Sequence, residues 1–129
     1  MTYVTFELPP DVDHGAFEEW FVGIVRRYRE EPGCVAYDYL RNPEHPTQGA
    51  MIEVWQTVED SATHLLSPAH IEMVALSTAK WGMHDIRTHK WTAAEGYGYT
   101  ERAAAHLGIE DRVEMYRLVT EFLADHPLD

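Results

Sequence analysis

The chain has 129 residues, the length of a single domain, and a domain of this size buries roughly 65% of the surface that its unfolded chain exposes. It is 45% hydrophobic and 25% charged, an ordinary globular composition, and no apolar run approaches the ~20 residues that span a bilayer. The formal net charge is −12, which repels both phosphate backbones and anionic lipid. We therefore expect neither a nucleic acid nor a membrane as a partner.

The N-terminal segment and the cysteine content both bear on the cellular compartment. Residues 1–7 already have the pattern of a strand and contain neither the basic nor the apolar region of a signal peptide, so we expect a cytoplasmic protein. Cys34 is the single cysteine, which excludes an intrachain disulfide and a cysteine-rich zinc site.

The first quarter of the chain predicts a strand followed by an amphipathic helix. Residues 2–8 are rich in β-branched and aromatic side chains and favour a strand, which Pro9 ends. Asp13 is a suitable N-cap for the helix, and Pro32 and Gly33 stop it. The buried stripe of this helix consists of residues at helical spacing: Phe17, Phe21, Ile24 and Tyr28.

Three further strands are predicted. Residues 34–40 and 50–56 flank a segment of turn-forming residues, which favours an antiparallel hairpin. A fourth strand is expected over 86–92, after Gly82 has ended the helix that precedes it.

The helix between the third and fourth strands is predicted to be broken. Thr57 can cap a first segment that runs to Leu66. Ser67 and Pro68 then supply a new N-cap and a first helical position for a second segment that reaches about residue 80.

This order of elements, βαββαβ, is that of a ferredoxin-like α+β fold, an antiparallel sheet with its helices on one face. The first strand carries Phe6 on one face and Tyr3 on the other, so a second surface must cover the face without helices. We assign residues 1–94 to this domain and residues 95–129 to a C-terminal helical extension.

The extension is expected to be helical from about residue 100, with a break near Gly108. We expect it to pack on its own domain or on a dimer mate, with a lid over the pocket as the alternative. Its predicted apolar stripe consists of Ile109, Val113, Tyr116, Val119 and Leu123.

Four sequence motifs point to one family. These are MIEVW at 51–55, HLLSPAH at 64–70, EEPGC at 30–34 and YDYL at 37–40. Over residues 1 to about 92 the chain resembles the antibiotic biosynthesis monooxygenase family, in particular its small quinol-monooxygenase-like members. The resemblance implies a homodimer in which two sheets close into a dimeric α+β barrel. It also implies oxidation of a small aromatic hydroxyl compound, of the quinol or anthrone type, by O2 without metal or flavin.

The resemblance directs attention to His64, Trp55 and Tyr39 as candidate catalytic residues. An imidazole with a pKa near 6.5 can take a phenolic proton and return it, which suits His64. Trp55 can supply an aromatic wall and an N–H donor, and Tyr39 can help to hold the ring and the oxygen.

We expect His70, Glu53 and Tyr37 to bind the substrate. Glu53 shares a strand face with Trp55, and a buried carboxyl must be paired or have a raised pKa. Pairing with Arg41 or Arg87 is the structural alternative for Glu53, and core packing is the alternative for the aromatic residues.

The chain also departs from its relatives. The quinone-forming branch has Asn, Tyr and Arg at the positions that we align with Met51, Ser61 and Ala75, so that branch's mechanism is not carried over. A haem-degrading relative would need an axial His near Val74, and no HxH or HExxH spacing favours a metal site. We therefore expect no cofactor. A non-catalytic ligand-binding or pathway-accessory barrel remains the alternative function.

Overall fold

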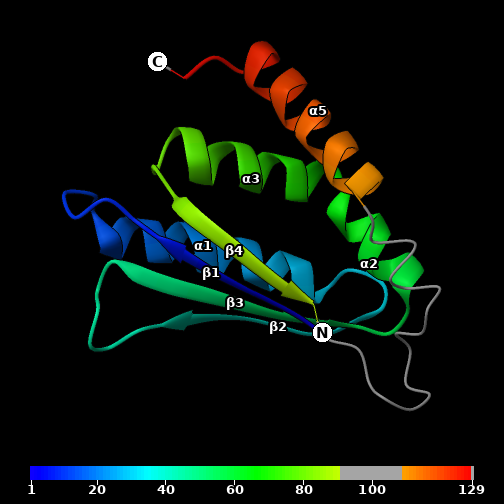
Figure 1. Ribbon diagram of the computed structural model, residues 1–129, viewed down its shortest axis with the longest axis horizontal. Helices are drawn as coiled ribbons and strands as arrows, with labels where there is room; N and C mark the ends of the chain where they lie inside the picture. Colours follow the sequence, from blue (N-terminus) through cyan, green and yellow to red (C-terminus); the bar gives the residue numbers. More distant parts are fainter. Residues whose placement is uncertain (91–108, 129) are drawn as a thin grey trace.

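The computed structural model describes residues 1–90 and 109–128. Within them, four strands form one antiparallel sheet in the order β2-β3-β1-β4, and α1, α2 and α3 cover one face of it (Figure 1). This confirms the predicted ferredoxin-like α+β fold. The elements are β1 (Thr2–Glu7), α1 (His14–Arg29), β2 (Cys34–Arg41), β3 (Gln48–Trp55), α2 (Val58–Leu65), α3 (Pro68–Ala79), β4 (His84–Lys90) and α5 (Ile109–Asp125).

Helix α1 begins and ends where the sequence predicts. The carboxylate of Asp13 accepts a hydrogen bond from the backbone N–H of Ala16 at 3.0 Å and thereby caps the helix. The four residues of the predicted stripe are all buried, and they pack on the sheet. The helix stops before Gly33, whose φ of 80° lies in the left-handed region.

The predicted break between α2 and α3 is also confirmed. Thr57 caps α2 by accepting a hydrogen bond from the N–H of Asp60, and Ser67 caps α3 by accepting one from the N–H of His70 at 3.2 Å. Pro68 occupies the first turn of α3, where its missing N–H costs no hydrogen bond. The break places the end of α2 and the start of α3 side by side over the sheet.

Strand β4 begins two positions earlier than the sequence predicts. Gly82 has a φ of 73° and the N–H of Met83 donates to the carbonyl of Ser77, so the chain returns to the sheet at once and pairs from His84 onward. Residues 91 and 92, the end of the predicted strand, lie outside the described residues.

The C-terminal helix α5 packs on α3 through a different stripe from the predicted one. Met115 and Val119 are buried against Ile71 and Ala75, and Phe122 packs beside them. Val113 and Tyr116 are instead 62% and 59% exposed, so their place in the predicted stripe is wrong. The contact uses Met115 and the positions four and seven residues after it. The sequence pattern alone did not distinguish this stripe of the helix from the predicted one.

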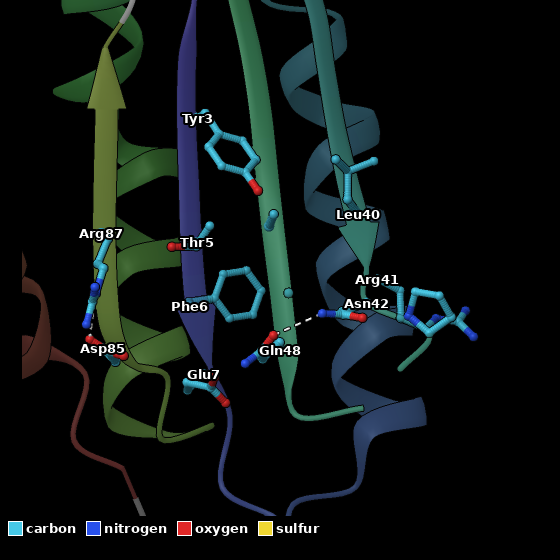
Figure 2. Close-up of a pocket in the computed structure, with 13 residues that line it drawn as sticks. Tyr3, Thr5, Phe6, Glu7, Leu40, Arg41, Asn42, Gln48, Asp85 and Arg87 are labelled. Carbon is cyan, nitrogen blue, oxygen red and sulfur yellow. Dashed lines mark hydrogen bonds and ion pairs between the residues drawn. The ribbon is translucent and has the colours of Figure 1, made fainter. Parts of the chain in front are cut away.

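None of the described helices lies on the other face of the sheet. Figure 2 shows Tyr3, Thr5 and Leu40 projecting from this face, with the helices behind the strands. They border a shallow hollow of about 460 Å³. Among the described helices, none is long and apolar enough to cross a bilayer.

Candidate functional site

A cavity of about 250 Å³ lies between the helix-covered face of the sheet and helices α2, α3 and α5. Its wall combines apolar side chains with polar ones, and thioethers are prominent among the apolar side chains. Four of the chain's five methionines, all within the described residues, line this cavity: Met51, Met73, Met83 and Met115. Thioethers are polarisable and make favourable contacts with aromatic rings, so this wall suits a flat aromatic ligand.

Helix α5 forms part of the same wall. Met115 and Tyr116 contribute to the lining, opposite Val4 and Met51 of the sheet. The helix therefore borders the cavity and does not fill it. In the described part of the predicted extension, α5 packs on α3 of the same chain. Residues 95–108, with the predicted helix start near residue 100 and the break near Gly108, lie outside the described residues.

The carboxylate of Glu53 faces this cavity from β3. Its side chain is only 14% exposed, and burial raises its pKa, while the nearby His64 and the indole of Trp55 act in the opposite direction. The structural alternative of an arginine partner is wrong, because Arg87 pairs with Asp85 and Arg41 pairs with Glu18. A buried carboxyl with a raised pKa at the wall of a cavity is a candidate general base.

His70 lines the cavity from the first turn of α3. Its Nδ1 lies 2.8 Å from the backbone carbonyl of Leu65. A carbonyl only accepts, so Nδ1 carries the proton and Nε2 keeps its lone pair. Burial, with His64 nearby, lowers the pKa of His70 to about 3. The ring therefore stays neutral at physiological pH and acts as a hydrogen-bond acceptor.

His64 lies behind the cavity wall and does not line the cavity. Its side chain is 1% exposed, its Nδ1 is 2.8 Å from Oε2 of Glu31, and its Nε2 is 3.7 Å from Oε2 of Glu53. His64, a candidate catalytic residue from the sequence, is therefore not among the residues that line the cavity, although its ring is buried on the sheet side of α2. Nε2 has no hydrogen-bond partner among the described residues.

Aromatic rings fix the position of His64. It stacks on Trp55, with 4.6 Å between ring centroids and 27° between the planes, and the edge of Tyr28 meets it at the same centroid distance. His70 is 4.7 Å away, and Tyr37 5.6 Å away, between centroids. Such packing holds the imidazole in one orientation relative to both carboxylates.

The two tyrosines predicted on β2 have different surroundings. Tyr37 lines the cavity, and its hydroxyl donates a weak hydrogen bond to Sδ of Met51 at 3.6 Å. Burial, then the charge of Glu53, raises the pKa of Tyr37, so the hydroxyl stays protonated. Tyr39 lies farther along the strand, in the aromatic core with Phe17, and does not border the cavity.

Five of the six predicted residues thus gather at one place. Glu53, His70 and Tyr37 line the cavity, and His64 and Trp55 lie directly behind it. Sequence reasoning missed Glu31 as a partner of His64, although it belongs to the EEPGC motif. It also missed the methionines, which as single apolar residues carry no signal in a sequence.

The described residues contain no group of three or more side chains able to hold a metal ion. The polar groups at the cavity are the carboxylate of Glu53, the imidazole of His70, several hydroxyls and the ammonium of Lys90, whose charge lowers the pKa of Glu53. The carboxylate and the imidazole suit proton transfer to and from a ligand.

Comparisons with known proteins agree with this fold. A family model described as antibiotic biosynthesis monooxygenase matches residues 1–76. No curated protein is significantly similar to the chain.

Several solved structures share the fold at low sequence identity. One named as a putative antibiotic biosynthesis monooxygenase from Deinococcus radiodurans has a TM-score of 0.65 at 18% identity, covering 77% of this chain and 96% of its own. A similarly named protein from Nitrosomonas europaea has a TM-score of 0.64 at 22% identity, covering 75% and 91%. SnoaB, a cofactor-independent oxygenase from Streptomyces nogalater, has a TM-score of 0.60 at 19% identity, covering 74% and 93%. At these identities the similarity shows the fold alone.

Proposed function

Since the chain belongs to the antibiotic biosynthesis monooxygenase family, whose model matches residues 1–76, we propose that it is a cofactor-independent monooxygenase. Its substrate is a small aromatic hydroxyl compound that O2 oxidises in the cavity between the sheet and α3. The observation that carries this proposal is the carboxylate of Glu53, which faces a methionine-lined cavity from a nearly buried position.

Glu53 is the group best placed to start the reaction. A carboxylate in an apolar site with a raised pKa is a stronger base than a solvated one, and it can remove a proton from a phenolic hydroxyl. The resulting anion is electron-rich and can react with O2 directly. One oxygen atom then bonds to a ring carbon in place of its hydrogen, and the O–O bond breaks. The other oxygen leaves as water, with the proton returned by Glu53 and the hydrogen lost from that ring carbon, and the substrate supplies the electrons as it becomes a quinone.

His70 and Tyr37 supply the orientation. Nε2 of His70 accepts a hydrogen bond from one substrate hydroxyl, and its low pKa keeps it from competing with Glu53 as a base. The protonated hydroxyl of Tyr37 donates to an oxygen on which charge develops. His64 and Trp55 hold Glu53 from behind.

The cavity volume limits the size of the substrate. An engineered protein cavity of about 150 Å³ holds benzene, and this cavity measures about 250 Å³. We therefore propose a quinol or catechol of one or two rings. A three-ring anthrone would need α5 to move away, because Met115 and Tyr116 form part of the wall.

We also propose that the protein is a homodimer that buries the helix-free face of the sheet, as the family resemblance implies. Leu40 of β2 is 41% exposed on this face, with Tyr3 of β1 on the other side of β3, and a second sheet would remove both side chains from water (Figure 2).

One observation favours a second candidate, a non-catalytic ligand-binding protein. His64 and Trp55, the expected catalytic pair, do not border the cavity, and a binding protein needs only the cavity itself.

Oxygen uptake separates the two candidates. The protein is mixed with one- and two-ring quinols and catechols in air-saturated buffer containing a metal chelator, and ligand binding is followed in parallel by quenching of tryptophan fluorescence. Uptake above the protein-free rate supports the monooxygenase. Binding without uptake across the panel overturns it and favours the binding protein.

A further inference from the structure

Three side chains form a row from the cavity to the protein surface. Glu53 borders the cavity, His64 is buried behind it, and Glu31 lies beyond His64 with its side chain 23% exposed. We propose that Glu53, His64 and Glu31 form a proton relay that carries the substrate proton out of the cavity and returns it later in the reaction. The proposal rests on the proposed function and deepens it by assigning a role to Glu31.

The outer step of the relay is a hydrogen bond. Nδ1 of His64 and Oε2 of Glu31 are 2.8 Å apart. An ionised carboxylate only accepts, so Nδ1 carries the proton and donates it to Glu31. In the neutral ring this leaves a lone pair on Nε2, at the end that faces Glu53.

The inner step, between Glu53 and His64, has no hydrogen bond in this structure. Nε2 of His64 is buried, has no hydrogen-bond partner among the described residues, and lies 3.7 Å from Oε2 of Glu53. A buried polar atom without a partner is unfavourable, and Glu53 needs to approach by only about 1 Å to make a hydrogen bond. When Glu53 is protonated, its O–H has a ready acceptor in Nε2.

The groups around His64 leave the two carboxylates as its proton partners. Tyr28 donates its hydroxyl to the backbone carbonyl of Ala69 at 3.1 Å, and His70 uses Nδ1 for the carbonyl of Leu65. Burial raises the pKa of both Tyr28 and Tyr37, and it lowers that of His70. Other titratable and charged groups that act on this cluster are the Cys34 thiol, the Lys90 ammonium, the Met1 amino group, and Arg27 and Glu72, which act on Tyr28.

The proton that the relay carries is balanced over one turnover, and the second hydrogen of the departing water comes from the oxygenated ring carbon. The substrate O–H bond breaks and the proton joins Glu53; Glu53 then gives a proton to Nε2, and His64 releases the proton on Nδ1 to Glu31, which passes it to water. His64 now carries its proton on Nε2. The reverse passage restores the starting tautomer, because Glu31 takes a proton from water, Nδ1 regains one, and Nε2 returns its proton through Glu53 to the oxygen that leaves as water.

A static ion pair is the competing explanation. In that case His64 is a permanent cation held between Glu31 and Glu53, with a proton on each nitrogen and no transfer. The two explanations differ in the protonation state of His64. They also differ in whether Glu31 speeds the exchange of the proton on Nδ1 of His64 with water.

The test uses the protein without substrate, labelled with nitrogen-15 in its histidine rings. The His64 signals are assigned by their loss in His64→Gln, and the exchange of the Nδ1 proton with water is measured at neutral pH. Glu31→Gln keeps the shape and can still accept the hydrogen bond, but an amide cannot take up the proton. Glu30→Gln removes the same charge at the neighbouring exposed position and is the matched control.

The relay predicts a neutral His64 protonated on Nδ1, with proton exchange that slows by about tenfold or more in Glu31→Gln and is unchanged in Glu30→Gln. A doubly protonated ring, a proton on Nε2 alone, or exchange that is unchanged or faster in Glu31→Gln overturns the relay. No substrate takes part, so failure here is distinct from absence of oxygen uptake, which concerns the proposed function.

Discussion

Gly33 lies directly against the side chain of Asp60. A Cβ built on Gly33 would lie 2.1 Å from Oδ2 of Asp60, and Gly33 itself has a φ of 80°. Asp60 in turn accepts a hydrogen bond from the hydroxyl of Thr57, the N-cap of α2, at 2.7 Å. This contact brings the turn after α1 against α2, and it thereby places Glu31 beside His64.

We predict that Gly33→Ala disturbs this arrangement. The side chain would meet Asp60 and the backbone would be strained in the left-handed region, so the free energy of unfolding should fall by about 1–3 kcal/mol. Gly23→Ala is the control, because no atom lies within 4 Å of its Cβ and alanine favours a helix. Urea unfolding measures both variants, and equal stabilities would contradict the account of the turn.

We predict opposite pH dependences of stability for His70 and Glu53. The folded pKa of His70 is about 3, below its unfolded value near 6.5, so the unfolded chain binds the extra proton between these values. His70 therefore makes the protein less stable as the pH falls from about 6.5 towards 3, by up to about 1.4 kcal/mol per pH unit.

The raised pKa of Glu53 acts in the other direction. The folded state holds its proton to a higher pH, so Glu53 reduces stability as the pH rises from about 4.5 through its folded pKa. Thermal unfolding should be measured from about pH 3 to neutral pH. Compared with the wild type, His70→Gln should lose less stability as the pH falls below about 6.5, and Glu53→Gln should lose less stability as the pH rises above about 4.5. Parallel profiles for the wild type and both variants would contradict the burial of these groups.

We predict that Met115 of α5 limits the size of the ligand. Met115→Ala should widen the cavity, strengthen the binding of three-ring phenols and lower the free energy of unfolding by roughly 2–3 kcal/mol. Val113→Ala, on the exposed side of the same helix, should change neither property. Binding titrations with compounds of one, two and three rings check this, and identical size preferences in both variants would refute it.

We predict a dimer through the helix-free face of the sheet. Light scattering at micromolar concentration should give twice the mass of the chain for the wild type. Leu40→Glu, which places a charge at this face in both subunits, should give the monomer. Val113→Glu adds the same charge on α5 and should leave the dimer intact. A monomeric wild type would reject this interface.

The elements of the fold could be predicted because each has a local signal. Asp13, Thr57 and Ser67 are N-caps with apolar periodicity after them, and the structure confirms all three. The site was harder to predict. Glu31 and His64 come from separate elements, and their pairing depends on how the turn at Gly33 packs on α2, a tertiary contact that no local pattern encodes.

The same limit explains the errors. Tyr39 has the same strand face as Tyr37, but its position farther along β2 places it in the aromatic core. Val113 and Tyr116 fit a helical stripe, yet α5 turns a neighbouring stripe towards α3. Alternation and periodicity define which residues share a face, whereas the partner of that face is set by the fold.

The cytoplasmic location stays a prediction.

The most direct test of the central claim is a measurement of isotopically labelled O2 incorporation in the wild type and in Glu53→Gln, using a one- or two-ring quinol and a metal chelator. The account predicts one labelled oxygen atom in the product of the wild type and a rate lower by about 10²–10⁴-fold in Glu53→Gln. Glu44→Gln, in the exposed loop between β2 and β3, should match the wild type. A product without labelled oxygen, or equal rates in Glu53→Gln and the wild type, would contradict the account.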